Sequence, residues 1–279
     1  MSSLPEPRTA AGRAGLAALL AAPHAALLAV DYDGVLAPIV ADPTKSPPLP
    51  GAVAALSRVA ARLGSVAVIS GRPAQVVVDY CRFDPQTPLT VFGHYGRQRW
   101  EARTREISEP PPPPGLASLR QELPSVLDHA GVTDAWVEDK IVAVAVHTRR
   151  SADPDGALAA LREPLAECAA RHGLAVEPGR YVIEIRPPGF DKGATLRSFL
   201  QERGATAVCY LGDDLGDLPA FDAVEAMRSA GIAGLTVAAG SAEVTEVAER
   251  ADLVVDGPSG VVMLLTALAD TLGSSMDRG

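Results

Sequence analysis

Two aspartates separated by one residue, Asp31 and Asp33, stand directly after an apolar run and before Gly34. Phosphoryl transfer requires a nucleophile, a group that protonates the departing oxygen, and cations that offset charge on the phosphoryl oxygens. Two aspartates at a strand end can supply the first two roles and part of a Mg²⁺ site, because Mg²⁺ prefers oxygen ligands. The same pattern also suits an ordinary loop or half of a calcium site, so it needs support from other segments.

Two further segments carry groups suited to holding an anion. Residues 70–73 read Ser-Gly-Arg-Pro after a second apolar run, and Pro73 suits the first turn of a helix. Ser70 and nearby amides could then hold an anion at a helix N-terminus, although an ordinary N-cap serine fits equally. Lys192, one of three lysines in the chain, lies in a glycine-flanked turn before another helical pattern. It is either an anion-binding group or an exposed lysine.

Residues 212–217 read Gly-Asp-Asp-Leu-Gly-Asp after a third apolar run. The mutual repulsion of Asp213, Asp214 and Asp217 calls for a cation. A calcium loop of the EF-hand type would need a downstream glutamate at fixed spacing and flanking helices, and this segment has neither.

Alternating strand and helix patterns must position these segments. Apolar runs predict strands at 25–30, 65–69 and 207–211, with short strands near Leu235 and Leu253. Helical spacing predicts helices at 51–63, at 193–203, beyond Pro219 and at 259–272. The alternation predicts an α/β fold with a parallel sheet, in which ligands bind at the carboxyl ends of the strands.

The middle of the chain has a different pattern. The five prolines at 110–114 predict a stiff extended segment, followed by a helix to about residue 130, a strand pair at 136–148 and a helix at 157–171. In a strand at 180–186, Ile183 and Ile185 alternate with Glu184 and Arg186, which predicts one packed face and one presented face. We therefore predict an α+β insertion at 98–186 between two halves of the core, 1–97 and 187–279.

The composition and net charge limit the kinds of partner that this chain can bind. The net charge of −9 and the pI near 5.1 disfavour nucleic acid and anionic membranes. Cys81, Cys168 and Cys209 are scattered, so they indicate buried apolar residues rather than disulfides or a zinc cluster. Leucines at helical spacing within 15–22 predict an amphipathic first helix rather than a signal peptide. We expect a cytoplasmic monomer.

The order Asp-x-Asp, Ser, Lys, Asp-Asp at successive strand ends resembles the four motifs of haloacid dehalogenase phosphatases. Further segments resemble the trehalose-6-phosphate phosphatase family within that superfamily: 137–140, 147–149, 182–187, 189–193, and 212–217 with Phe221. The resemblance extends from Leu27 to about Leu272. It implies a Rossmann-like parallel-sheet core with an inserted α+β cap that closes over it.

The resemblance also implies a role for each matching residue. Asp31 would attack phosphorus, and Asp33 would protonate the leaving sugar oxygen and later activate water. The implied Mg²⁺ ligands are the side chains of Asp31 and Asp213 and the backbone carbonyl of Asp33, with Asp214 and Asp217 close by. The implied phosphoryl-binding residues are Ser70 and Lys192, with Arg72 nearby. The implied sugar-binding residues are Glu138, Lys140 and Glu184.

The chain departs from the family pattern in three loops. Tyr95 stands where histidine is usual, Val35 follows Gly34 where threonine is common, and Gly216 and Leu218 replace threonine and glutamate. The resemblance implies hydrolysis of trehalose 6-phosphate. The alternatives are a phosphatase for a related phosphorylated disaccharide, glycosyl-glycerate or pseudo-disaccharide, and a non-catalytic module that senses a sugar phosphate. The presence of Asp31, Ser70 and Lys192 speaks against the last.

Overall fold

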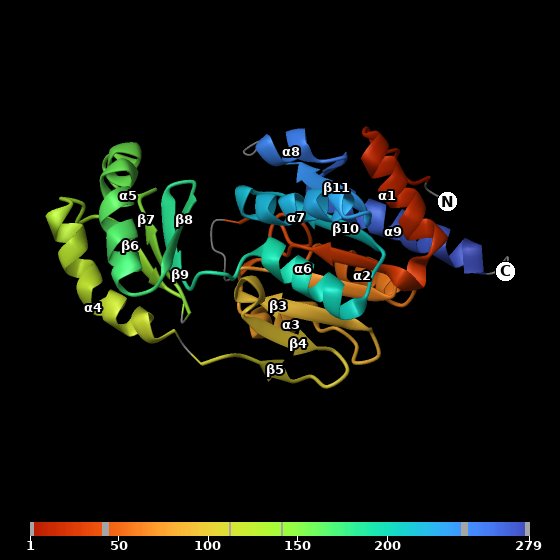
Figure 1. Ribbon diagram of the computed structural model, residues 1–279, viewed down its shortest axis with the longest axis horizontal. Helices are drawn as coiled ribbons and strands as arrows, with labels where there is room; N and C mark the ends of the chain where they lie inside the picture. Colours follow the sequence, from red (N-terminus) through yellow and green to blue (C-terminus); the bar gives the residue numbers. More distant parts are fainter. Residues whose placement is uncertain (1–2, 41–44, 112, 141, 241–244, 277–279) are drawn as a thin grey trace. The chain divides into compact units, whose positions relative to one another are not determined.

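The computed structural model describes residues 3–40, 45–111, 113–140, 142–240 and 245–276. The chain forms two compact units: a core unit of Met1–Glu109 with Phe190–Gly279, and a cap unit of Pro110–Gly189. Figure 1 shows the elements of each unit. This division starts the insertion at Pro110 rather than at residue 98, because the strands at 98–101 and 107–108 pair with the core sheet.

The core unit contains an eight-stranded sheet that is parallel over its first six strands and antiparallel over the last two. In spatial order the strands are β12 (Leu253–Asp256), β11 (Ala233–Gly240), β10 (Ala207–Gly212), β1 (Ala26–Val30), β2 (Ser65–Ile69), β3 (Leu89–Gly93), β4 (Gln98–Glu101) and β5 (Ile107–Ser108). The predicted α/β fold with a parallel sheet is confirmed.

Helices cover both faces of this sheet. Alternate residues of β1 point to opposite layers: Leu28 and Val30 join one apolar cluster, and Leu27 and Ala29 join the other. The first cluster includes side chains of α1 (Ala10–Ala21), α2 (Ala52–Ala60), α3 (Ala74–Cys81) and α9 (Gly257–Met276). The second includes side chains of α6 (Lys192–Arg203), α7 (Leu218–Ser229) and α8 (Glu246–Arg250). Burial on both faces explains why the strands are continuous apolar runs.

The order of the strands reverses at β1. From β1 the chain builds β2 and β3 on one side, and after the cap it builds β10, β11 and β12 on the other. A crevice forms at the carboxyl ends of the strands where an open parallel sheet changes direction in this way. Asp31 directly follows β1 and Asp213 directly follows β10, so the topology brings two predicted site residues to one point.

The cap unit is a four-stranded antiparallel sheet with two helices on one face (Figure 1). Its elements are α4 (Pro114–His129), β6 (Trp136–Asp139), β7 (Val144–His147), α5 (Pro154–Arg171), β8 (Ala175–Gly179) and β9 (Val182–Arg186). Ile183 and Ile185 pack against the helices, as their alternation predicts. Glu184 is paired with Ala145 of β7 and Glu177 of β8 on the opposite face of the sheet. The sequence did not reveal β8.

The predicted first helix is present as α1, and its Leu19 is buried in the core. The proline run ends in α4, with Pro114 as its first residue, while Pro112 lies outside the described residues. Among the described residues, no helix combines the length and the apolar character needed to cross a bilayer.

Candidate active site

Asp31 is held in one orientation at the end of β1. Its backbone N–H donates to the carbonyl of Leu211 at 2.9 Å, which continues the pairing of β1 with β10. Its Oδ1 accepts a hydrogen bond from the backbone N–H of Tyr32 at 2.6 Å, and its Oδ2 accepts one from Nζ of Lys192 at 2.7 Å. Asp31 is only 5% exposed, so these contacts replace most of its hydration.

Lys192 links two carboxylates inside the core. It is the first residue of α6, whose N-cap Asp191 accepts a hydrogen bond from the backbone N–H of Ala194. Its Nζ lies 2.7 Å from Oδ2 of Asp31 and 2.7 Å from Oδ1 of Asp217. Burial alone would lower the pKa of Lys192, but the two carboxylates raise it well above its usual value. Lys192 is therefore a buried ammonium group rather than an exposed surface lysine.

Asp217 organises the acidic loop. Its Oδ2 accepts hydrogen bonds from the backbone N–H groups of Asp213 and Asp214, at 2.9 and 3.2 Å. Its Oδ1 accepts from the Tyr210 hydroxyl at 2.6 Å and from Lys192. Burial alone would raise the pKa of Asp217, but Lys192 and these donors lower it. The sequence prediction placed Asp217 only near the metal ligands, whereas its contacts hold the loop that carries Asp213 and Asp214.

Four carboxylates meet at this point: Asp31, Asp213, Asp214 and Asp217 each offer an oxygen, and these oxygens lie within 4.8 Å of one another. Burial, followed by the charge of Asp31, raises the pKa of Asp213 to about 9. Burial also raises the pKa of Asp31, although Lys192 opposes the shift. Four carboxylates with one ammonium group among them form a set of oxygen ligands that fits the preference of Mg²⁺.

The glycine after the first aspartate pair permits this approach. Gly34 has a φ of +71°, which favours glycine, and a Cβ at this position would lie 1.9 Å from Oδ2 of Asp213. A side chain at residue 34 would therefore displace Asp213 as well as strain the turn. The Asp-x-Asp-Gly pattern and the acidic loop depend on each other sterically.

Asp33 and Arg72 form an ion pair beside the buried carboxylates. The Nε and one terminal nitrogen of Arg72 donate to the two carboxylate oxygens of Asp33 at 2.7 and 2.6 Å. The hydrogen bond to Asp33 raises the pKa of Arg72. Ser70 is buried, and its Oγ accepts from the backbone N–H of Arg72 at 3.1 Å. Ser70 therefore stabilises the loop through the backbone of Arg72. It is not the N-cap of α3, because that position is held by Pro73.

Tyr95 lies against the same loop. Its backbone N–H donates to the carbonyl of Ser70 at 2.9 Å, and its own carbonyl accepts from the Thr195 hydroxyl at 2.7 Å. A Cβ on Gly71 would lie 2.7 Å from the phenolic oxygen of Tyr95, so the ring covers the Gly71 backbone. The residue that replaces the usual histidine thus borders the predicted phosphoryl-binding segment.

The three predicted sugar-binding residues share the face of the cap sheet opposite its helices. Lys140 donates to Oε2 of Glu184 at 2.6 Å, and Nε2 of His147 lies 3.0 Å from Oε2 of Glu138. Trp136 stacks on the His147 ring with centroids 4.7 Å apart, and neither residue was among the predicted sugar-binding residues. Their register across β6 and β7, Trp136 opposite His147, could have indicated this pair.

Glu184 has unused hydrogen-bonding capacity. It is 7% exposed, and within the described part of the chain its Oε1 has no hydrogen-bond partner. A buried acceptor left without a donor costs about 1–3 kcal/mol. Such an atom favours a ligand that can donate to it, such as a sugar hydroxyl.

The structure thus brings the core residues Asp31, Lys192, Asp213 and Asp214 together, with Asp33, Ser70 and Arg72 in loops after the neighbouring strands β1 and β2. The cap residues form their own group on one sheet face.

Comparisons with known proteins agree with this arrangement. The trehalose-phosphatase family model matches residues 116–259. The trehalose-phosphate phosphatase of Mycobacterium avium is 34% identical over 281 residues, covering 98% of this chain and 68% of that protein.

Solved structures show the same fold. The trehalose-6-phosphate phosphatase of Aspergillus fumigatus has a TM-score of 0.68 at 25% identity, covering 96% of this chain and 100% of that one. A haloacid dehalogenase-like hydrolase from Bacteroides thetaiotaomicron shares the fold with a TM-score of 0.59 at 16% identity, covering 86% of this chain and 97% of that one. The resemblance found in the motifs is confirmed: the chain belongs to the trehalose-phosphatase family and has the haloacid dehalogenase fold.

Proposed function

We propose that this chain is a phosphatase that hydrolyses trehalose 6-phosphate to trehalose and inorganic phosphate with the help of Mg²⁺. The observation that carries the proposal is the buried Asp31, hydrogen-bonded to Lys192 among four carboxylates, in a member of the trehalose-phosphatase family. The fixed orientation and lack of hydration of Asp31 suit a nucleophile that must face one phosphorus atom.

In the first proposed step, a carboxylate oxygen of Asp31 attacks phosphorus and the bond to the sugar oxygen breaks. Asp33 gives a proton to that oxygen, so trehalose leaves as a neutral alcohol and Asp31 carries the phosphoryl group. In the second step Asp33 takes a proton from water as the water oxygen attacks phosphorus. The Asp31 carboxylate is restored and phosphate leaves.

The phosphoryl charge needs compensation in both steps. Lys192 would donate to a phosphoryl oxygen from its position beside Asp31, together with the Ser70 hydroxyl. The proposed Mg²⁺ ligands are Asp31, Asp213 and the backbone carbonyl of Asp33, with Asp214 nearby. Bound there, Mg²⁺ would offset charge on the phosphoryl oxygens and on the clustered carboxylates.

Arg72 couples substrate binding to the proton transfer in this proposal. Its two hydrogen bonds occupy both carboxylate oxygens of Asp33. A phosphoryl group is a competing acceptor for the guanidinium. When Arg72 turns to the phosphoryl group, the carboxyl group of Asp33 is released and can face the sugar oxygen.

The cap supplies selectivity in this proposal. Glu138, Lys140 and Glu184 would hydrogen-bond the sugar hydroxyls, and Oε1 of Glu184, which has no donor among the described residues, supports this role. A substrate that lacks those hydroxyls would forgo the hydrogen bonds they make to the three groups, at about 1–3 kcal/mol each. Glucose 6-phosphate should therefore be a poorer substrate by at least about 100-fold in kcat/KM.

Release of phosphate tests the proposal across a panel of trehalose 6-phosphate, glucose 6-phosphate, sucrose 6-phosphate and p-nitrophenyl phosphate. Trehalose 6-phosphate should have the highest kcat/KM, a chelator should stop turnover, and Mg²⁺ should restore it. Full activity in chelator would contradict the metal assignment. Beryllium fluoride, which mimics a phosphoryl group, should inhibit by binding at Asp31.

One observation favours a second substrate. Tyr95, which replaces the usual histidine, covers the Gly71 backbone next to Ser70 and Arg72. A phenol at that place alters the hydrogen bonding available to a bound ester. If another phosphorylated disaccharide, glycosyl-glycerate or pseudo-disaccharide has a higher kcat/KM than trehalose 6-phosphate, it is the substrate.

The location and assembly state belong to the same proposal. Three free cysteines, all buried, suit a reducing compartment, and the net charge of −9 disfavours binding to nucleic acid or an anionic membrane. These properties support a cytoplasmic location. We further propose that the chain is a monomer, which light scattering after size exclusion would test.

A further inference from the structure

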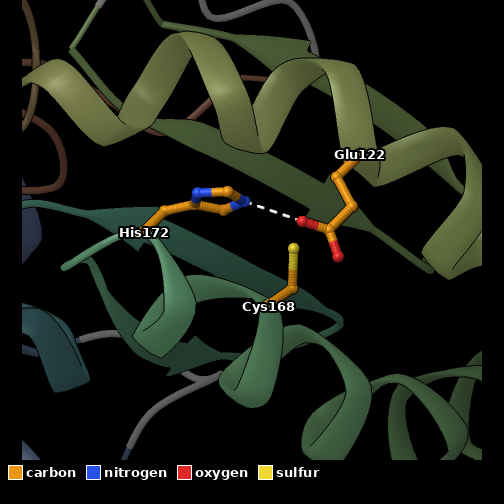
Figure 2. Close-up of side chains that lie close together, drawn as sticks. All are labelled: Glu122, Cys168 and His172. Carbon is orange, nitrogen blue, oxygen red and sulfur yellow. Dashed lines mark hydrogen bonds and ion pairs between the residues drawn. The ribbon is translucent and has the colours of Figure 1, made fainter.

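A second cluster of metal-ligating side chains lies in the cap unit, where the proposed reaction uses none of them. Glu122 extends from α4, Cys168 lies in α5, and His172 is the C-cap residue of α5. Figure 2 shows the three side chains pointing toward one another. Cys168 and His172 are four residues apart, so they share one side of the helix end and face α4.

The ligand atoms are close enough for one ion. A carboxylate oxygen of Glu122, the sulfur of Cys168 and a ring nitrogen of His172 all lie within 4.8 Å of one another. Oε2 of Glu122 is 2.7 Å from Nε2 of His172, a contact drawn in Figure 2. Ligands of a tetrahedral ion stand about 2.0–2.3 Å from it, so a slight separation of His172 from Glu122 would admit the ion.

The chemistry of the three groups selects the ion. Thiolate and imidazole are ligands for Zn²⁺ and Co²⁺, whereas Mg²⁺ takes oxygen ligands and keeps several waters. The carboxylate and a thiolate together carry the charge that a dication neutralises. This set therefore differs in kind from the all-carboxylate group of the core unit.

Neighbouring groups orient one ligand and place partial negative charge beside another. Arg171 pairs with Oε1 of Glu122, which orients the carboxylate and leaves Oε2 toward His172. The C-terminal end of an 18-residue helix carries partial negative charge at His172. Cys168 is fully buried, and no step of the proposed hydrolysis involves it.

We propose that Glu122, Cys168 and His172 bind one Zn²⁺ ion, with water in the fourth position. The ion joins α4 to α5 and stabilises the cap unit. This site is independent of the proposed hydrolysis, because its ligands lie outside the residues assigned to that reaction.

A titration of the full chain with Co²⁺, followed by absorption spectroscopy, tests the site. The protein is stripped of metal and then titrated with Co²⁺ in excess Mg²⁺, which occupies the oxygen-only site of the core. A thiolate-to-cobalt band in the near ultraviolet should saturate at one equivalent, and Zn²⁺ should abolish it. Cys168→Ser should remove the band, and His172→Gln or Glu122→Gln should weaken Co²⁺ binding by more than about 100-fold.

Two matched controls separate metal binding from other roles. Cys81→Ala removes a buried cysteine of the core unit, and Arg171→Gln removes the other ion pair of Glu122 but leaves the three ligands. Both variants should keep the thiolate band. Zn²⁺ should also raise the melting temperature of the wild type and of these controls, but not that of His172→Gln.

Absence of the thiolate band in the wild type would overturn the proposal, as would its persistence in Cys168→Ser. Equal Zn²⁺ affinity in the wild type, Glu122→Gln and His172→Gln would place the ion elsewhere and overturn it too. If Cys168→Ser does not fold, the comparison of His172→Gln with Arg171→Gln decides the question.

Discussion

In the core unit, the side chains of Lys192, Asp31 and Asp217 are 4%, 7% and 0% exposed, whereas Lys140 and His147 of the cap unit are 29% and 26% exposed. The difference follows from the two sheets. Helices cover both faces of the core sheet, while within the cap unit the two helices cover one face. Lys192, Asp31 and Asp217 therefore have mainly one another as partners, whereas Lys140 and His147 retain access to water.

This contrast indicates that the core and cap residues have different roles. A buried charge that loses its partner is destabilising, so the core cluster serves both the fold and the chemistry. A half-exposed pair can exchange its partner for water or a sugar hydroxyl at little cost to stability. Substitutions in the core should therefore affect turnover and stability, and substitutions in the cap should affect selectivity.

The largest effect is expected from Asp31→Asn. An amide is a poor nucleophile for phosphorus, so kcat should fall by at least about 1,000-fold. The variant should remain folded, because the amide oxygen can still accept from Lys192. Phosphate release measures the loss, and circular dichroism checks the fold. Activity above a trace would show that another residue is the nucleophile.

Lys192→Ala should combine both consequences of burial. It leaves Asp31 and Asp217 without their shared cation, so the free energy of unfolding should fall by about 3–5 kcal/mol in the absence of Mg²⁺. Turnover should fall as well. Urea denaturation measures the change in stability.

Arg58→Ala is the matched control for that measurement, because it removes an exposed ion pair with Asp270 in the same unit. Arg58→Ala should lower the free energy of unfolding by less than about 1 kcal/mol. If both variants lose the same free energy of unfolding, burial does not make the ion pairs of Lys192 more important for stability than an exposed pair.

The cap substitutions Glu138→Ala and Glu184→Ala should each lower the preference for trehalose 6-phosphate over glucose 6-phosphate by about 10–100-fold. Hydrolysis of p-nitrophenyl phosphate should stay nearly unchanged, because this small ester makes no use of sugar-binding groups. Both substrates are measured as kcat/KM. A parallel loss on p-nitrophenyl phosphate would assign these residues to the chemistry or the fold instead.

The smallest effect is expected where the acidic loop departs from the family pattern. A Cβ on Gly216 would lie 3.1 Å from Oδ1 of Asp214, which caps the short helix Leu215–Asp217. Gly216→Thr combined with Leu218→Glu should therefore alter stability or KM modestly, with kcat within about tenfold of the wild type. A gain of several orders of magnitude in kcat would show that the natural loop is impaired.

The sequence indicated where Asp31, Ser70 and Asp213 lie, because each directly follows an apolar strand. Parallel strands place their carboxyl ends at one edge of a sheet, so Asp31 and Asp213 were expected at the same edge, and the pairing of β1 with β10 brings them together. The alternation in β9 likewise identified which face of the cap sheet carries Glu184. The motifs also indicated the family that the comparisons confirmed.

Contacts between distant segments were decided by the tertiary structure alone. The sequence of β4 and β5 did not show that these strands extend the core sheet, since pairing with β3 depends on the fold of the whole unit. Asp217 became the organiser of the acidic loop only through Lys192 and Tyr210. Cys168 reads as one more buried apolar residue until the packing of α4 on α5 sets Glu122 and His172 beside it. Local patterns determine which element a residue belongs to, and packing determines which side chains it meets.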